Sequence, residues 1–116
     1  MMNQQIVTFR EMFPHIKDGG LYMCEDCHTS YWENFGGGLE YSGSFIEFSK
    51  RLVDEINAYW TGTKMKPTYN SQNISGLHFY TSMVVVEKNE RAYQPFALQI
   101  GELTVSNRAG YFANTL

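Results

Sequence analysis

The sequence is poor in several features that would assign it to a common class of protein. Its 116 residues include only two cysteines and three prolines, and the net charge is −3. Two cysteines cannot build a disulfide scaffold, which favours a reducing, cytoplasmic setting. Without a basic surplus, nucleic acid is not an expected partner. The longest apolar run, residues 83–86, is too short to span a bilayer, so no membrane association is expected.

A nucleotide-binding loop is also missing, because no Gly-rich turn leads from a strand into a helix. The glycine run at residues 36–38 does not qualify, since no strand pattern immediately precedes it and no helix begins there. Hydrophobic residues make up 43% of the chain, enough for a core. The length bounds the chain to one small domain.

Two stretches have the periodicity of amphipathic helices. In the first, Pro14 should end the regular helix near Met12 or Phe13. The second begins at Ser44, whose spacing to Glu47 predicts a capping box. The apolar stripe of the first helix is Ile6, Phe9, Phe13 and Ile16, and that of the second is Phe45, Phe48, Leu52, Ile56 and Trp60.

The strands are predicted from short apolar runs. Residues 21–24 do not alternate, which is typical of a strand buried on both faces in a parallel sheet. Residues 74–79 and 83–87 are separated by a short connection, so they should pair antiparallel. Residues 97–100 and 103–105 could be short strands around Gly101, or the tail from 89 to 116 could be a loose arm. Residues 27–43 read as a long irregular loop and 63–72 as a polar surface loop.

Four segments together resemble a known family. They are GGLYMCEDCHTSYW at 19–32, FREMFPHIKDGG at 9–20, GSFIEFSKRLVDEINAYW at 43–60 and ISGLHFYTSMVVVEK at 74–88. Over residues 3–100 the chain resembles class I S-adenosylmethionine-dependent methyltransferases. In particular it is similar to the metal-dependent sugar O-methyltransferases of macrolide biosynthesis, of the mycinamicin and macrocin type.

The resemblance implies an α/β fold: the C-terminal half of a Rossmann-like sheet, in the order helix–strand–helix–strand–strand, with an antiparallel closing hairpin. Residues 1–116 would then be a single partial domain of a longer enzyme. Such an enzyme methylates a small-molecule hydroxyl, such as that of a sugar, with S-adenosylmethionine and Mg²⁺ or a similar divalent cation. The donor-binding half lies outside this sequence, so we expect the isolated chain neither to bind the donor at micromolar affinity nor to turn over.

Glu25 and Asp26 follow the strand at residues 21–24, at the edge where open α/β sheets bind ligands. Adjacent carboxylates suit a hard cation such as Mg²⁺, and the resemblance implies that these two acids ligate it with an upstream acid. Strand alternation would point them to opposite faces, so both reach one ion only if the strand ends between them. The alternative is a pair of solvated acids at a strand-to-loop junction.

Other candidates lie in the loop after the acids. His28 could act as a base or orient a substrate hydroxyl, although the resemblance places the base in an upstream segment. Tyr31, Trp32 and Phe35 could form a wall for the substrate, or could instead seal the sheet against the loop.

Two further interpretations compete with methyl transfer. Residues 24–28 spell C-x-x-C-H, the attachment motif of c-type haem, but that motif usually opens a helix and here it ends a strand. In the alternative, purely structural interpretation, Cys24 packs in the core, Cys27 lies in the loop, and no disulfide joins them. Alternatively the chain could be an inactive or self-associating module, because a bare apolar strand at 21–24 would promote homo-oligomers.

Overall fold

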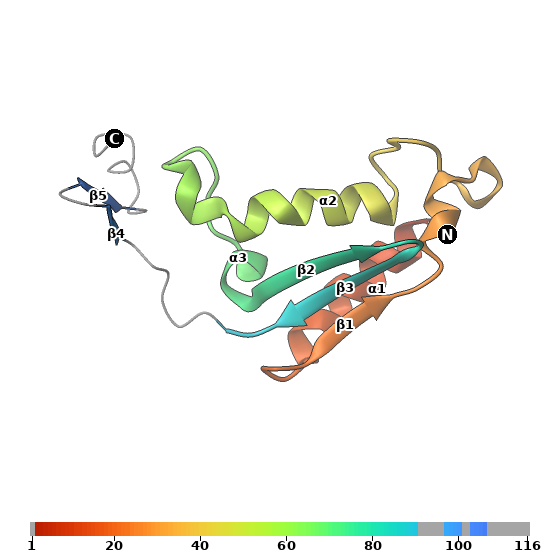
Figure 1. The fold of residues 1–116 in the computed structure, drawn as a ribbon. Coiled ribbons are helices and arrows are strands. Elements are labelled where there is room, and N and C mark those ends of the chain that lie inside the picture. The colour runs from red at the N-terminus through yellow and green to blue at the C-terminus, as the bar shows by residue number, and fades with distance from the viewer. Residues whose placement is uncertain (1, 91–96, 101–102, 107–116) are drawn as a thin grey trace.

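The computed structural model describes residues 2–90, 97–100 and 103–106, and the side chains of residues 3–90. Its main sheet has the strand order β1-β3-β2, with β1 at Leu21–Cys24, β3 at Met83–Lys88 and β2 at Ile74–Tyr80. Both outer strands run antiparallel to β3 (Figure 1). The predicted closing hairpin of β2 and β3 is therefore confirmed, and β3 is the central strand of the three-stranded sheet.

The tail contains a second, two-stranded sheet. Its strands are β4 (Ala97–Ile100) and β5 (Leu103–Ser106), which pair antiparallel. The two short strands predicted around Gly101 are thus confirmed, and the rest of the tail after Glu90 lies outside the described residues.

The first helix ends at the position predicted from Pro14. Helix α1 spans Met2–Met12, and a 3₁₀ turn, η1 (Phe13–His15), continues it with Pro14 in its first turn. Proline lacks the N–H that the next α-helical bond requires, so the regular helix stops just before it.

Helix α2 spans Phe45–Ile56 and begins at its predicted N-cap. The Ser44 side chain accepts a hydrogen bond from the Glu47 backbone N–H at 3.1 Å. The Glu47 carboxylate pairs with Lys50 at 2.9 Å instead of completing the capping box. The helix is shorter than its apolar stripe predicted, because the chain tightens into the 3₁₀ turn η4 (Ala58–Thr61), which contains the half-buried Trp60.

One short helix was missed in the predicted polar loop. Helix α3 spans Tyr69–Asn73, and Thr68 and Ser71 form a reciprocal capping box at its start. The loop predicted at residues 27–43 likewise contains two 3₁₀ turns, η2 (Cys27–Tyr31) and η3 (Glu33–Phe35). None of the helices in the described part combines the length and apolarity that a membrane crossing needs.

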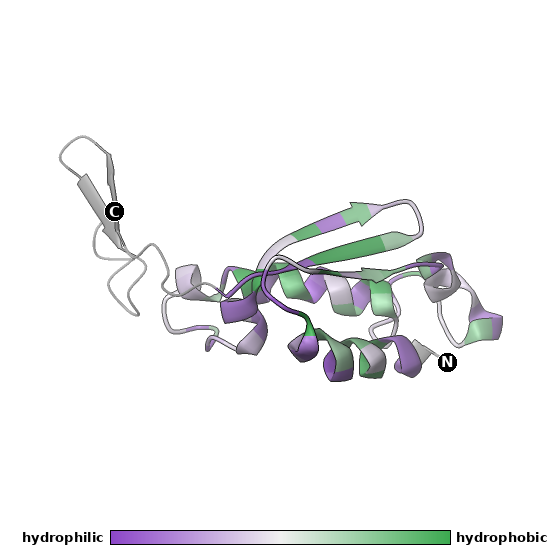
Figure 2. Ribbon diagram, turned by 90° about the horizontal axis from the view of Figure 1, so that it is seen from below, coloured by the Kyte–Doolittle hydropathy of each residue, from purple (hydrophilic) through white to green (hydrophobic). Residues whose placement is uncertain are grey.

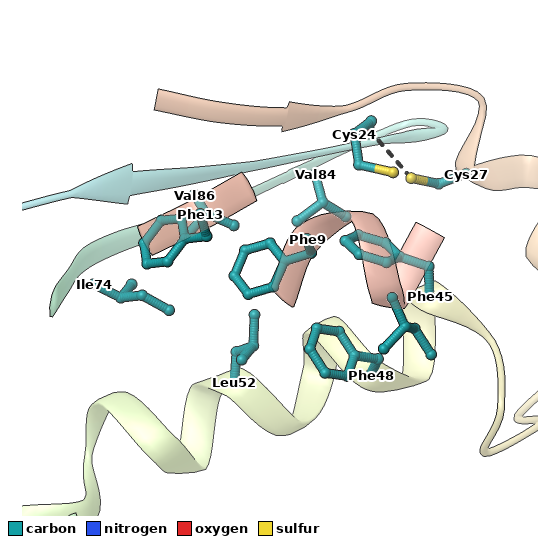
Figure 3. Packing of buried hydrophobic residues seen from close by; sticks show 11 residues of the cluster. Phe9, Phe13, Cys24, Cys27, Phe45, Phe48, Leu52, Ile74, Val84 and Val86 are labelled. Atoms are coloured by element: carbon teal, nitrogen blue, oxygen red, sulfur yellow. Dashed lines mark hydrogen bonds between the residues drawn. The ribbon is translucent and has the colours of Figure 1, made fainter. Parts of the chain in front are cut away.

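Both long helices cover the same face of the sheet (Figures 1 and 2). Phe9 of α1 lies at the centre of this layer, stacked on Phe13 at 4.9 Å between ring centroids and edge-on to Tyr22 of β1 at 5.1 Å. Its ring also meets Phe48 of α2 at 5.6 Å. Figure 3 shows this cluster between the sheet and α2; its buried members are Ile6, Phe9, Phe13, Cys24, Cys27, Phe45, Phe48, Leu52, Ile74, Val84 and Val86.

The opposite face of the sheet is open in the described part of the chain. Leu21 and Met23 of β1 are 55% and 51% exposed, and Tyr80 at the end of β2 is 61% exposed. The prediction that residues 21–24 are buried on both faces of a parallel sheet is therefore wrong for this structure. The physical reason is that α1 and α2 cover one face only, and that β1 is an edge strand whose single partner here is the antiparallel β3.

Lys88, the last residue of β3, is a buried cation at the end of α1. Its ammonium donates to the Ile16 carbonyl at 3.0 Å and to the Tyr69 hydroxyl at 2.8 Å. It also lies 5.1 Å from the centroid of the Phe13 ring, in cation–π geometry. Carbonyls at a helix C-terminus carry partial negative charge, so this position favours a cation.

We expect Lys88→Ala to lower the free energy of unfolding by about 2–4 kcal/mol, because it removes both the packed stem and the donors to the Ile16 carbonyl and the Tyr69 hydroxyl. Lys88→Met should lose less, since it restores the stem but not the hydrogen bonds. Urea unfolding measures both, with the exposed Lys17→Ala as the control. Equal midpoints for Lys88→Ala and Lys17→Ala would contradict this role.

Candidate functional site

The predicted acid pair lies just beyond the end of β1. The strand ends at Cys24, so Glu25 and Asp26 are both outside it and strand alternation does not force them to opposite faces. Asp26 has φ 55°, in the left-handed region, so the chain changes direction between the two acids. Both residues are exposed, and neither carboxylate is paired with a cation or a hydrogen-bond donor among the described residues. The strand therefore ends before both acids and not between them, and strand alternation decides the direction of neither carboxylate.

Thr29 holds the backbone at the second acid. The Asp26 carbonyl accepts hydrogen bonds from the Thr29 N–H at 3.3 Å and from the Thr29 hydroxyl at 3.1 Å. These two bonds close the first turn of η2 directly after the left-handed residue. The backbone conformation at Asp26 is thus fixed by hydrogen bonds within the loop itself.

The two carboxylates are the right type of ligand for a hard divalent cation, but they are too few to complete its coordination. Two unpaired carboxylates supply the oxygen ligands that Mg²⁺ prefers. No group of three or more histidine, cysteine, aspartate or glutamate side chains that could hold a metal occurs within the described residues. A cation bound at Glu25 and Asp26 therefore requires water or ligands from outside this part of the chain.

His28 lies next to the acids and is anchored to the β2–β3 hairpin. Its Nδ1 is 2.6 Å from the Ser82 hydroxyl oxygen, and its backbone N–H donates to the same oxygen at 3.2 Å. The ring stands edge-on to Trp32, with 4.8 Å between centroids. Ser82 had no signal in the sequence, because nothing in a turn reveals which distant side chain it meets.

The structure brings part of the predicted aromatic wall together. Trp32 and Phe35 are 5.8 Å apart between ring centroids, and Trp32 is 48% exposed. Tyr31 is also exposed, but it makes no ring contact with Trp32 or Phe35 in the described structure. His28, Trp32 and Phe35 therefore form a row of contacting rings in the loop that follows the acid pair, and Trp32 leaves ring area accessible.

The glycine run at residues 36–38 packs against the backbone of the segment that carries Trp32. The Gly37 N–H donates to the Trp32 carbonyl at 3.0 Å, and the Gly38 N–H donates to the Ser30 carbonyl at 2.8 Å. A β-carbon built on Gly37 would collide with the backbone carbonyl of Ser30. Glycine at this position therefore allows one segment of the loop to lie directly on the other.

We expect Gly37→Ala to displace the loop that carries Trp32, at a cost of about 1–3 kcal/mol in stability from overpacking. Gly38→Ala is the matched control, because a β-carbon there would be 3.7 Å from its nearest neighbour, the Tyr41 β-carbon. Tryptophan fluorescence together with thermal unfolding measures both effects. A Gly37→Ala variant that behaves like Gly38→Ala would show that the close approach is not needed.

The two cysteines are both buried and both free. The Cys27 thiol donates to the Cys24 carbonyl at 3.2 Å (Figure 3). A separate side-chain hydrogen bond between the two cysteines, together with burial, raises the pKa of the Cys24 thiol above its usual range. Cys27 begins η2 at the start of the predicted loop, but its side chain is buried in the core, which the sequence did not predict. Neither thiol forms a disulfide. Buried sulfurs in the core do not offer the exposed thiols that haem attachment requires.

Three cavities lie away from the acid pair. Their volumes are about 310, 390 and 220 Å³, and all three border the helical layer, with Arg10 or Arg51 in their walls. None of the three is lined by Glu25, Asp26 or His28. These three cavities are therefore separate from the predicted site at the acids.

Comparison with known proteins identifies the family. No family model matches the sequence. Mycinamicin VI 2''-O-methyltransferase of Micromonospora griseorubida is 40% identical over 86 residues, a match that covers 70% of this chain and 22% of that enzyme. The chain belongs to the macrolide sugar O-methyltransferase family. Demethylmacrocin O-methyltransferase of Streptomyces fradiae is 33% identical over 75% of this chain and 24% of its own length.

A solved structure agrees with this membership. The MycE methyltransferase of the mycinamycin biosynthetic pathway, in complex with Mg and SAH, matches with a TM-score of 0.68 at 37% identity, over 78% of this chain and 25% of that one. The resemblance in sequence and the predicted fold, a C-terminal part of a methyltransferase, are thereby confirmed. The chain spans about a quarter of the length of the family members it matches.

Proposed function

We propose that this chain forms the metal-binding edge of an S-adenosylmethionine-dependent O-methyltransferase that acts on a small-molecule hydroxyl, in particular that of a sugar. The observation that carries the proposal is the pair of unpaired carboxylates, Glu25 and Asp26, placed after β1 in a chain 40% identical to such an enzyme. The cytoplasmic setting and the oligomeric state stay predictions.

Glu25 and Asp26 would hold a divalent cation together with ligands from elsewhere in the enzyme. When bound, the cation supplies Lewis-acid chemistry that lowers the pKa of an acceptor hydroxyl and orients it. The chain's own part is to present two carboxylates on a backbone that Thr29 and the left-handed Asp26 keep fixed. The complex of MycE with Mg and SAH supports this role by similarity.

The exposed rings beside the acids suit an acceptor with apolar faces. Trp32 and Phe35 offer flat surfaces on which a sugar ring can pack, while His28 offers a polar edge. MycE has been solved with Mg, SAH and mycinamycin VI, which supports a small-molecule acceptor. We therefore assign Trp32 and Phe35 to the acceptor side of the site, with Tyr31 at its margin.

The donor pocket would lie outside this chain. The unpaired edge of β1 and the open face with Leu21 and Met23 are surfaces on which further strands and helices of an α/β domain could pack. Exposed apolar surface of this kind marks an interaction site. The same surface would support self-association, the alternative role.

A segment exchange tests the proposal. The 86-residue matched segment of the Micromonospora enzyme is replaced by that of this chain, and methylation of mycinamicin VI is measured with S-adenosylmethionine and Mg²⁺. We expect the chimera to retain methyl transfer that chelation abolishes. A chimera that folds and binds the donor but transfers no methyl group would overturn the proposed function.

A further inference from the structure

Ser82 ties the β2–β3 hairpin to the loop that follows the acid pair. It lies in the turn between the two strands, with φ 60°, a left-handed conformation that serine rarely adopts. Its carbonyl accepts the Cys27 N–H at 2.9 Å, and its hydroxyl oxygen accepts the His28 N–H at 3.2 Å. Two parts of the chain that are 54 residues apart are thus joined directly after the acids.

The hydroxyl proton of Ser82 has an acceptor within reach. A serine hydroxyl donates one proton and accepts through two lone pairs, and the His28 backbone N–H already occupies one of them. His28 Nδ1 lies 2.6 Å from the hydroxyl oxygen, a short distance for a neutral hydrogen bond. Among the contacts of the described residues, Nδ1 is the group that can accept this proton.

A neutral imidazole carries its proton on one nitrogen, and the hydrogen bond made by the other nitrogen decides which. If Nδ1 accepts from Ser82, the ring proton is on Nε2. The edge-on contact with Trp32, at 67° between ring planes, further restricts rotation of the imidazole. The ring is then both oriented and fixed in one tautomer.

We propose that Ser82 is a positioning residue that holds His28 as the Nε2–H tautomer, so that His28 gives the site a hydrogen-bond donor for a substrate oxygen and not a general base. The part that concerns the substrate rests on the proposed function; the tautomer does not. The proton of the acceptor hydroxyl is then taken by a group other than His28. The group that this donor recognises is an acceptor oxygen of the substrate, such as that of a hydroxyl or an ether.

Long-range ¹H–¹⁵N NMR of the imidazole rings in the 116-residue chain, above the usual imidazole pKa, reports the tautomer directly. His28→Gln assigns the signals. Ser82→Gly removes the hydroxyl while glycine accepts the left-handed backbone. Ser82→Asp offers only acceptor oxygens, so it should invert the tautomer to Nδ1–H. Thr81→Ala, at the exposed neighbour in the same turn, is the control.

We expect an Nε2–H pattern in the wild type and in Thr81→Ala, loss of that preference in Ser82→Gly, and inversion in Ser82→Asp. An Nδ1–H wild type, or an unchanged tautomer in a folded Ser82→Gly, overturns the proposal. Should Ser82→Gly not fold, the wild type and Ser82→Asp decide. If the chimera is inactive while NMR shows His28 as the Nε2–H tautomer, only the proposed function is overturned. If the chimera is active while NMR shows His28 as the Nδ1–H tautomer, only this inference is overturned.

Discussion

Phe9→Ala is expected to lower the free energy of unfolding by about 3–5 kcal/mol, the usual cost of emptying an aromatic site in a core. Phe9 is 1% exposed, and its ring contacts aromatic rings from η1, α2 and β1 at centroid distances of 4.9, 5.6 and 5.1 Å. It is the one side chain in the described core that joins all three elements by ring contacts. The whole stability of a small domain is only about 5–15 kcal/mol, so most of the helical layer should loosen.

Val7→Ala is the matched control on the same helix, because Val7 is 43% exposed and lies off the buried stripe. We expect its effect to stay within about 0.5 kcal/mol. Thermal unfolding by circular dichroism should show a fall of more than about 10 °C for Phe9→Ala and almost none for Val7→Ala. A Phe9→Ala variant that unfolds at the temperature of the wild type would show that α1 is not held by this cluster.

Glu25→Gln and Asp26→Asn are each expected to reduce methyl transfer by the chimera at least about 100-fold, because loss of even an indirect partner of a metal ligand costs 10–100-fold. Each change keeps the side-chain size and removes the charge that a hard cation requires. Neither carboxylate has a hydrogen-bond or ion-pair partner in the described structure, so stability should not change. The measurement is the initial rate of methylation across a Mg²⁺ titration.

Glu33→Gln supplies the control, since Glu33 is an exposed acid in η3 of the same loop. Its rate and Mg²⁺ dependence should match those of the parent chimera. If raised Mg²⁺ restores the rate of Glu25→Gln, the loss was one of cation affinity, as expected. A Glu25→Gln chimera with full activity at low Mg²⁺ would remove this residue from the site.

Much of the fold follows from local patterns. The stop of α1 at Pro14, the Ser44 N-cap of α2 and the β2–β3 hairpin each depend on residues close together in sequence. Helix α3 was missed because its signal is short: the pair Thr68 and Ser71 makes a capping box without glutamate or an apolar stripe. The segment is polar, so it has no apolar periodicity from which a helix could be predicted.

The environment of β1 could not be predicted locally. The run Leu21–Cys24 has the composition of a strand with two covered faces, and only the tertiary arrangement shows that one face is open. Burial of Cys27 was missed for a similar reason, since a residue after a strand was expected to enter the loop. The tight turn of η2 instead brings its sulfur back under Cys24.

The position of the acid pair directly after a strand was predictable, its role as a ligand site stays a prediction, and its surroundings could not be predicted. Adjacent carboxylates after an apolar strand point to a ligand edge from sequence alone. The contact of His28 with Ser82 joins positions 54 residues apart, and no periodicity encodes it. Likewise, Tyr31, Trp32 and Phe35 look alike in the sequence, whereas only Trp32 and Phe35 meet in space.

The most direct test of the central claim is paramagnetic broadening by Mn²⁺, which shares the oxygen ligands of Mg²⁺. Amide NMR signals of the 116-residue chain are recorded as Mn²⁺ is added in trace amounts. The account predicts that signals of Glu25, Asp26 and Cys27 broaden first, and that Glu25→Gln with Asp26→Asn abolishes this effect. Broadening centred on another acidic surface, such as Asp54 and Glu55 of α2, or broadening unchanged by the two substitutions, would contradict it.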